Sequence, residues 1–566
     1  MLRLCFLLED SAVFAEPAEF DRKYQLLYRK FVKFLYANPK FSFAFSFSGP
    51  QLAYYSRNYP EFIDILHQMV LRKQVELLGG GYYNPLFPLL LPQDRSGQIE
   101  MLTALVRDIS GSRPKGIVPA ESAWDFTMIT QMNTCGIEYA MLDCSVMPAS
   151  APRHCPLVVS YQGRTSVILP VRDALLKDAG DFDSFMARVI ADVPAGSADS
   201  AVVTVRFAPA DFARFVEAGW FVAAAQSDAQ TVRPFDCIKA SPEFVPVFLQ
   251  SAVRRKDGAH GGDCSVFDLL HSRPEGQALY NRMLYISRLL EHCKVGDKAR
   301  RNEAKRKLWK AQSALFYGFA DTGPAYSYLA DAEKILQELS GFRPNLADVD
   351  YNGDRIREYL CRADSFSAVV QRRGGVVSEL NVLPVSVNYV SVRYGALFED
   401  SVRFLEDGCV VPFCALYSET KYDAHRRCVR LMCQQDCGSR GQALALVKHI
   451  ALTAIGFQVQ YIIRNRSDSA LSARFQVGFA FGSSRCAEGL AVEHTQAFAQ
   501  DDAVSAVLVA DADNGVRFLL EPNEGARLWY ERDTNSVRIE LGWDMELASG
   551  MEMEKTINLA IAAGRR

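Results

Sequence analysis

The sequence predicts a protein that combines an α/β domain, a helical segment and an all-β domain. Up to about residue 250, strand-like apolar segments alternate with amphipathic helices, as in a parallel sheet covered by helices. Residues 275–340 are helical, and short alternating strands typical of a β-sandwich follow from residue 346. Since one core rarely exceeds about 300 residues, we expect domains at residues 1–260, 261–345 and 346–566.

The α/β part contains seven strand-like segments, which read RLCFLL, FSFAFSF, VELLGG, GIVPAE, YAMLDCS, TSVILPV and AVVTVRF. Residues 60–72 and 97–109 lie between them and have helical periodicity. Leu2 to Leu8 is interpreted as a buried strand and not as a signal peptide, because Glu9 and Asp10 interrupt the apolar run. The alternation fits either an open doubly wound sheet or a barrel.

The helical and all-β parts follow in order. Three helices are predicted from EGQALYNRMLYISRLLEHC, ARRNEAKRKLWKAQSALFYGF and AYSYLADAEKILQEL. The basic run at 298–310 belongs to the second of these helices and is interpreted as a solvated face, because it contains a single aromatic residue, Trp309, and no basic excess accompanies it in the chain as a whole. Segments such as GFQVQYIIRN, ARFQVGFAFG and VRIELGW predict the strands of the sandwich.

Composition restricts the partners and the location. Lys and Arg number 63 against 66 Asp and Glu, giving a net charge of −3, so no global attraction to nucleic acid or anionic membranes is expected. No window of about 18 apolar residues predicts a membrane span. The 14 cysteines contain no CxxC pair, which favours reduced thiols in the cytoplasm. We expect neither a metal nor an organic cofactor, and the oligomeric state stays open.

Candidate binding residues follow the predicted strands, where α/β proteins build their sites. Tyr82 and Tyr83 end the third segment, Glu121 the fourth and Asp143 the fifth. Tyrosine faces beside carboxylates suit a sugar, because the rings stack on it while the carboxylates bind its hydroxyls. The alternatives are packing for the tyrosines and a role at a helix start for Glu121 and Asp143. Asp173 is interpreted as a surface loop residue.

The order of FSFSGPQL, QVELLGGGYYNPLFPLLLPQDRSGQIEML, KGIVPAESAWDFTMITQMNTCGIEYAMLDC and LYNRMLYISRLLE resembles glycoside hydrolase family 57, in its 4-α-glucanotransferase and α-amylase branch. The stretch at 348–390 resembles the start of that branch's β-sandwich. The resemblance implies an incomplete (β/α)7 barrel, a helical segment and a C-terminal β-sandwich. It also implies retaining chemistry, with a glutamate nucleophile and an aspartate acid/base, and it places Glu121 at the nucleophile position.

Several positions depart from the family pattern. Where the family keeps its acidic acid/base pair, this chain has Ala208 and Pro209, and Asp211, two residues later, is the weak substitute. Asn84 replaces a glutamate after the aromatic pair, and no histidine precedes His67. The helical cluster of the family is reduced to Phe316, Tyr317 and Gly318.

These departures predict an α-glucan or maltooligosaccharide protein with lost or reduced glycosyl-transfer activity. One alternative is an active retaining enzyme that uses Glu121 with Asp211 or Asp143. The other is an interaction protein that binds no carbohydrate. The expected substrate-binding residues are Tyr82, Tyr83, Asn84, Trp124, Asp143 and Tyr317.

Overall fold

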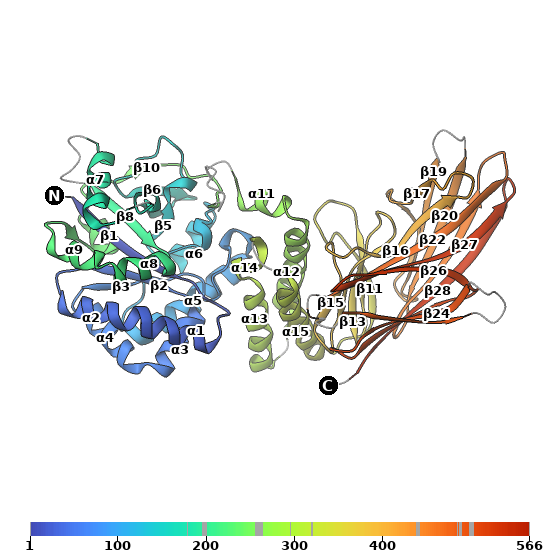
Figure 1. The fold of residues 1–566 in the computed structure, drawn as a ribbon, viewed down its shortest axis with the longest axis horizontal. Helices are drawn as coiled ribbons and strands as arrows, with labels where there is room; N and C mark the ends of the chain where they lie inside the picture. Colours follow the sequence, from blue (N-terminus) through green and yellow to red (C-terminus); the bar gives the residue numbers. More distant parts are fainter. Residues whose placement is uncertain are drawn as a thin grey trace. The chain divides into compact units, whose positions relative to one another are not determined.

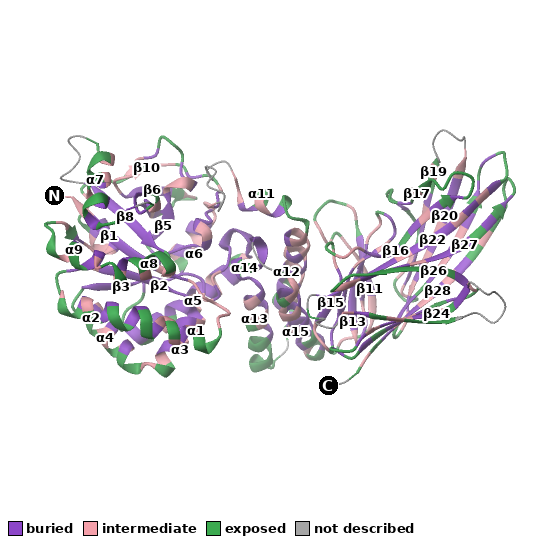
Figure 2. Cartoon of the chain, viewed as in Figure 1, coloured by how far each residue is buried: buried purple, intermediate pink, exposed green. Residues whose placement is uncertain are grey.

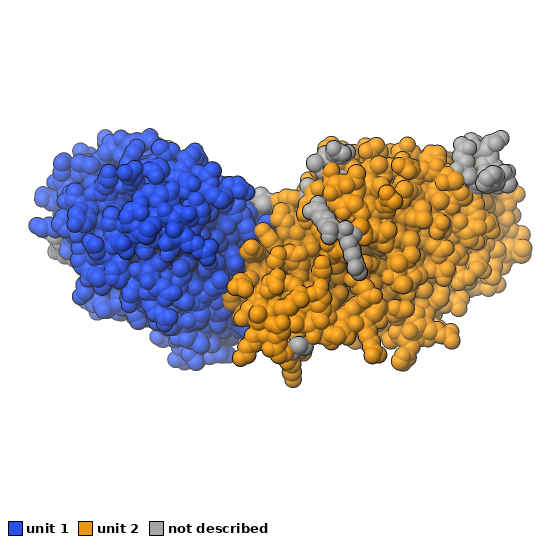
Figure 3. All heavy atoms as spheres, turned by 90° about the horizontal axis from the view of Figure 1, so that it is seen from below, with its two compact units in different colours: residues 1–273, 312–319 blue, residues 274–311, 320–566 orange. Residues whose placement is uncertain are grey.

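The computed structural model describes residues 2–177, 179–194, 201–254, 264–294, 296–318, 321–436, 442–483, 485, 489–496 and 503–564. The chain forms two compact units (Figure 3). Unit 1 contains residues 1–273 and 312–319, and unit 2 contains residues 274–311 and 320–566. The expected three-domain division, with boundaries at 260 and 345, stays a prediction.

Unit 1 is built on a ring of parallel strands (Figure 1). Parallel pairing runs in the order β3, β2, β1, β8, β7, β5, β4, and a parallel bridge between Gly79 and Ile117 joins β4 to the end of β3. These seven strands confirm the incomplete (β/α)7 barrel, so the open doubly wound sheet is excluded. Their bounds are β1 Arg3–Asp10, β2 Phe43–Phe47, β3 Val75–Leu77, β4 Gly116–Ile117, β5 Tyr139–Asp143, β7 Arg164–Val171 and β8 Val202–Phe207.

Further short strands extend this sheet. β6 (Leu157–Tyr161) pairs antiparallel with β7, whereas β9 (Gln230–Thr231) and β10 (Val245–Pro246) pair parallel with β1 and β6. The helices predicted at 60–72 and 97–109 are confirmed as α4 and α5. The helices of unit 1 are α1 Pro17–Lys23, α2 Arg29–Ala37, α3 Gly49–Asn58, α4 Pro60–Leu71, α5 Pro92–Ser110, α6 Met128–Thr134, α7 Phe182–Asp192, α8 Pro209–Glu217, α9 Trp220–Gln226, α10 Pro234–Lys239, α11 Val266–His271 and α14 Ala314–Gly318.

The barrel strands are buried along almost their whole length (Figure 2). Their side chains alternate between the two faces of the sheet, which positions the site. Phe6, Phe45 and Phe207 face outward into an aromatic core shared with the helices. Leu7, Met141 and Val171 belong to a second core, formed by the inward-facing residues. Continuing this alternation by two residues places the next side chains at the carboxyl ends of the strands, and these are polar, namely Glu9, Asp143 and Asp173.

Unit 2 contains the first and third predicted helices and most of the second, together with the β domain. The second predicted helix ends at Ala311, and its last residues form the separate helix α14 of unit 1. The helices of unit 2 are α12 (Pro274–His292), α13 (Lys298–Ala311) and α15 (Gly323–Ser340). Arg282 of α12, which is buried, forms an ion pair with Glu333 of α15 and donates a hydrogen bond to Ser367 Oγ of β13 (2.8 Å). The helices are thereby tied to the sheet.

The described strands of unit 2 form one antiparallel pairing network around a large apolar core, which confirms the predicted β-sandwich domain. Their bounds are β11 Asn345–Val349, β12 Glu358–Arg362, β13 Phe366–Val370, β14 Val377–Val382, β15 Val387–Val390, β16 Leu397–Phe404, β17 Val410–Pro412, β18 Ser418–Asp423, β19 Cys428–Asp436, β20 Ala443–Leu452, β21 Gly456–Asn465, β22 Leu471–Gly482, β23 Ala491–Gln496, β24 Ala503–Asp511, β25 Val516–Pro522, β26 Ala526–Arg532, β27 Ser536–Leu547 and β28 Glu552–Ala563. Within the described ranges, no helix is both long enough and apolar enough to cross a membrane.

Candidate functional site

Arg206 lies at the centre of a group of carboxylates at the barrel mouth. Its side chain is only 4% exposed, and it projects from β8 two residues after the buried Thr204. Nη1 donates to Glu9 Oε2 (2.9 Å), Nε to Asp173 Oδ2 (3.0 Å) and Nη2 to Asp143 Oδ2 (3.3 Å). One guanidinium therefore connects the ends of four barrel strands or the loops that directly follow them.

Glu121 lies in the turn after β4 and is held by a second arginine. Its backbone is left-handed (φ 49°, ψ 28°), and Ser122 also has φ 49°, a conformation that L residues adopt at a cost of roughly 1–3 kcal/mol. Arg254 Nη2 donates to Glu121 Oε2 (3.1 Å), and the Arg254 amide donates to the Glu121 carbonyl (2.8 Å). Arg254 Nη1 also lies 3.6 Å from Asp173 Oδ2. Asp173 is thus shared by both arginines.

The pKa values of Asp143 and Asp173 are shifted in opposite directions. Burial raises the pKa of Asp173 to about 6, although Arg206 and Arg254 act in the opposite direction. Burial also acts to raise the pKa of Asp143, but hydrogen bonds from Ser145 and the charge of Arg206 outweigh it and hold this pKa below its ordinary value. The nearby carboxylates raise the pKa of Arg206 despite its burial. Within the described residues, no group of His, Cys, Asp or Glu side chains is arranged to hold a metal.

A cavity of about 520 Å³ opens beside this network. Ala208 lines it at the end of β8, where the family resemblance places an acidic residue. Pro209 begins α8 directly afterwards, and Asp211 lies in the first turn of this helix. The Asp211 side chain is 58% exposed and lies 3.6 Å from Arg214. The other lining residues are Glu9, Ser11, Asp173, Leu176, Lys177, Arg206, Phe207, Arg214 and Arg254.

The two tyrosines lie together, but neither lines the 520 Å³ cavity. Their rings make an edge contact with centroids 4.9 Å apart. Tyr83 is buried, and its amide donates to Gln98 Oε1 (3.0 Å). Tyr82 is partly buried, and its ring covers Gly49 so closely that a Cβ there would lie 2.3 Å from it. Only Tyr82 of the pair thus presents a ring that a ligand can reach.

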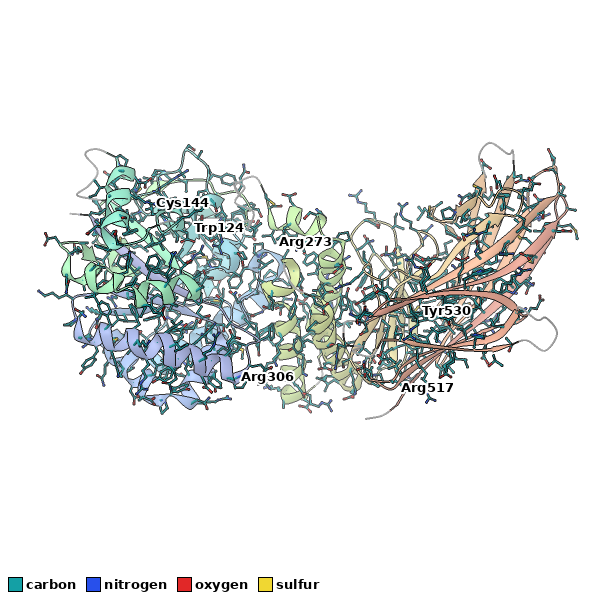
Figure 4. The ribbon with its side chains drawn as sticks, in the orientation of Figure 1. Trp124, Cys144, Arg273, Arg306, Arg517 and Tyr530 are labelled. Carbon is teal, nitrogen blue, oxygen red and sulfur yellow. The ribbon has the colours of Figure 1, made fainter. Side chains whose placement is uncertain are left out.

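The remaining predicted binding residues, Asn84, Trp124 and Tyr317, are held by backbone hydrogen bonds or buried in the core. Asn84 has φ 49°, and its carbonyl accepts from the Ala314 amide (3.0 Å). Trp124 is buried, and it exchanges two backbone hydrogen bonds with Ala252 (Figure 4). Tyr317 of α14 is also buried. A sugar can therefore reach Trp124 or Tyr317 only after the chain moves, and the substrate-binding role of all three stays a prediction.

Arg206, Arg254 and Asp173 have structural roles that the sequence pattern did not predict. We interpreted Asp173 as a surface residue, which is wrong: its side chain is 26% exposed and is ion-paired with Arg206. A signal for Arg206 was present, because a lone arginine within the buried strand VVTVRF requires buried partners. No such signal exists for Arg254, which lies in an irregular segment.

Comparison with known proteins identifies relatives that are similar to this chain in sequence or in fold. Residues 12–211 match the model of Glycosyl hydrolase family 57. A segment of 123 residues is 32% identical to alpha-amylase 1 of Dictyoglomus thermophilum, covering 22% of this chain and 18% of that protein. Another of 124 residues is 32% identical to 4-alpha-glucanotransferase of Thermococcus litoralis, covering 22% and 19%. These alignments span about a fifth of either relative.

A longer alignment and a solved structure extend the similarity. The alpha-amylase of Pyrococcus abyssi is 24% identical in an alignment 430 residues long that covers 66% of this chain and 63% of that protein. The crystal structure of 4-alpha-glucanotransferase from Thermococcus litoralis matches with a TM-score of 0.78 and 17% identity over 99% of both chains. The resemblance stated from the motifs is thus confirmed for the barrel region, where residues 12–211 match the model of glycosyl hydrolase family 57.

Proposed function

We propose that the barrel mouth binds an α-glucan such as a maltooligosaccharide and that its glycosyl-transfer activity is lost or strongly reduced. The observation that carries this proposal is the pairing of Glu121 with Arg254. A nucleophilic carboxylate must bring an oxygen to the anomeric carbon. Here Oε2 of Glu121 accepts a hydrogen bond from the Arg254 guanidinium at 3.1 Å, which leaves only Oε1 free to approach a sugar.

The end of β8 supports the same proposal. A retaining enzyme requires an acid/base carboxyl about 5–5.5 Å from its nucleophile. Ala208 brings only a methyl group to the cavity, and Asp211 is directed toward Arg214 and solvent. Since a misplacement of about 1 Å can cost on the order of 100-fold in rate, Asp211 is a poor substitute.

Binding remains compatible with this arrangement. The cavity has the size of small-molecule sites, which are about 300–1,000 Å³. Its charged groups are mostly neutralised in pairs, while their remaining lone pairs and N–H groups are available to the hydroxyls of a neutral sugar. Location in the cytoplasm and the absence of a nucleic-acid partner remain predictions from composition.

A second candidate function, an active retaining enzyme, is favoured by one observation. Burial raises the pKa of Asp173 to about 6, so this carboxyl holds a proton more readily than an ordinary aspartate, as a general acid must. Asp173 and Glu121 contact the same guanidinium, at 3.6 and 3.1 Å. In this reading Asp173, supplied by the end of β7, replaces the acid/base group missing from β8.

Incubation with maltoheptaose, with products followed by mass spectrometry, tests the two functions. The intact chain is compared with Glu121→Gln and Asp173→Asn, and binding is measured in parallel by calorimetry. Binding without new products supports the silent glucan-binding protein. A ladder of longer and shorter sugars that disappears in both variants establishes the active enzyme. If neither binding nor turnover occurs, both functions fail and the interaction protein becomes the better explanation.

A further inference from the structure

The β domain contains a second cavity, of about 480 Å³. Its floor is the outer face of β16, β22 and β27, which are adjacent in the sheet (Figure 1). Glu399, Gly478 and Glu540 form one row across these three strands. Because Gly478 has no side chain, the floor is open between the two glutamates. The other lining residues are Gln371, Arg373, Gly374, Val376, Asp400, Ser401, Pro412, Phe413, Cys414, Arg538 and Ile539.

Four charged side chains around this cavity lack partners. Glu399, Glu540, Arg373 and Arg538 make no side-chain hydrogen bond or ion pair within the described part of the chain. Glu540 is nevertheless partly buried, and this burial raises its pKa although Arg403 and Arg474 oppose the effect. Glu399, Arg373 and Arg538 are exposed to solvent, whereas Glu540 is partly buried. Because a partly buried polar group without a hydrogen-bond partner is costly, Glu540 gains most from a ligand that donates hydrogen bonds to it.

The balance of charges in the lining of this cavity indicates which class of ligand it can bind. Two carboxylates and two guanidinium groups leave the lining nearly neutral, since the remaining acid, Asp400, is already paired with the buried Lys448 (2.7 Å). A neutral lining rich in donors and acceptors attracts neither anions nor cations strongly. It suits a neutral molecule with many hydroxyl groups, which both donate and accept hydrogen bonds.

An aromatic ring adjoins the row of glutamates. Trp529 of β26 lies directly opposite Glu540, and its side chain is 39% exposed. Its ring packs over Gly542, where a Cβ would lie 2.9 Å from it, and the Arg474 guanidinium lies 5.0 Å from a ring centroid. Trp529 does not line the cavity itself, and Arg474 lies over its ring. The ring is fixed in place beside the row of glutamates and remains partly exposed, so it can add an apolar contact for a sugar bound next to it.

We infer that the cavity formed by β16, β22 and β27, with Trp529 at its edge, is a second carbohydrate-binding site that takes the end of a maltooligosaccharide chain. The cavity itself selects a neutral polyhydroxylated molecule, and the choice of an α-glucan rests on the proposed function of the barrel. The site holds the glucan and performs no chemistry on it.

Calorimetric titration of the full chain with maltoheptaose tests this site. Gly478→Leu fills the floor of the cavity, and the backbone permits it because a Cβ there meets Glu399 only at 3.5 Å. Ser472→Leu, on the same strand and face but six residues away, is the matched control. Ala208→Trp blocks the barrel cavity independently. We expect two sites in the native chain, one in each blocked variant, two in the control and none in the double variant.

The outcomes separate this inference from the proposed function. If Ala208→Trp abolishes all binding and Gly478→Leu none, the second site is refuted while barrel binding stands. If Gly478→Leu alone abolishes binding, the second site stands and barrel binding fails. Absence of binding to the native chain refutes both. Should Gly478→Leu lower the melting temperature, Glu540→Ala replaces it, with an expected rise of about tenfold or more in the Kd of the second site and an unchanged Kd refuting it.

Discussion

Replacing Asp173 by Asn should stabilise the protein at neutral pH, although it removes a carboxylate from an ion-pair network. Burial destabilises the ionised form of Asp173 more than the charges of Arg206 and Arg254 stabilise it, because its pKa in the folded state is about 6. Its ordinary value of 3.8 applies when the chain unfolds. Asn has the shape of the protonated side chain, and its carbonyl oxygen can still accept from Arg206.

The magnitude and its sign follow from these two pKa values. Because the folded pKa of Asp173 is raised, its contribution to stability is fully present below pH 3.8 and is lost as the pH rises through about 6. The difference corresponds to roughly 3 kcal/mol. Since the side chain is 26% exposed, solvent screening reduces this to about 1–2 kcal/mol. Asp173→Asn should therefore raise the free energy of unfolding by about 1–2 kcal/mol at pH 7.5 and leave it unchanged below pH 4.

Urea unfolding between pH 4 and pH 8 measures the difference between variant and native chain for the transition of unit 1. Asp211→Asn is the matched control, since Asp211 lines the same cavity but is 58% exposed. It should change stability by less than about 0.5 kcal/mol at every pH. Destabilisation by Asp173→Asn at pH 7.5, or a difference independent of pH, would refute the balance of burial and ion pairing argued for this network.

Three further predictions concern other parts of the chain. Lys448→Met should destabilise unit 2 by about 3–5 kcal/mol in urea unfolding, because it leaves the buried Asp400 without its cation. The additional change Asp400→Leu should restore most of this stability. A double variant as unstable as Lys448→Met would contradict the explanation. Gly49→Ala should displace the Tyr82 ring and weaken maltoheptaose binding at the barrel about three- to tenfold by calorimetry, whereas Gly80→Ala, where a Cβ meets only ordinary contacts, should not. Arg254→Gln should raise the rate of product formation from maltoheptaose if Arg254 blocks Glu121, and a fall in rate would favour the active enzyme.

The fold was predictable because periodicity and strand order carry most of its information. The segments from RLCFLL to AVVTVRF each became a strand of the barrel, since buried parallel strands require continuous apolar runs. The closure of the sheet into a barrel could not be predicted from any local sequence pattern. It depends on a single bridge between Gly79 and Ile117, beyond the short strand β3, and only the family resemblance indicated it.

The candidate site was predictable only in part. Strand ends identified Glu121 and Asp143, because a polar residue after an apolar run marks the mouth of a barrel. The partners of these residues were not predictable. Arg254 is 133 residues from Glu121 in the chain, and Arg206 is 197 from Glu9. Such pairings are set by the closed ring of strands, so no local spacing encodes them.

The end of β8 carries both the buried Arg206 and Ala208, which stands where the family resemblance leads us to expect an acidic residue. A guanidinium as deeply buried as that of Arg206 is tolerated only beside several carboxylates, and Glu9, Asp143 and Asp173 supply them. The same three groups then have little capacity left to polarise a sugar. Restoring an aspartate at position 208 should therefore not restore activity by itself, because Arg206 and Arg254 would continue to pair with the carboxylates that chemistry requires.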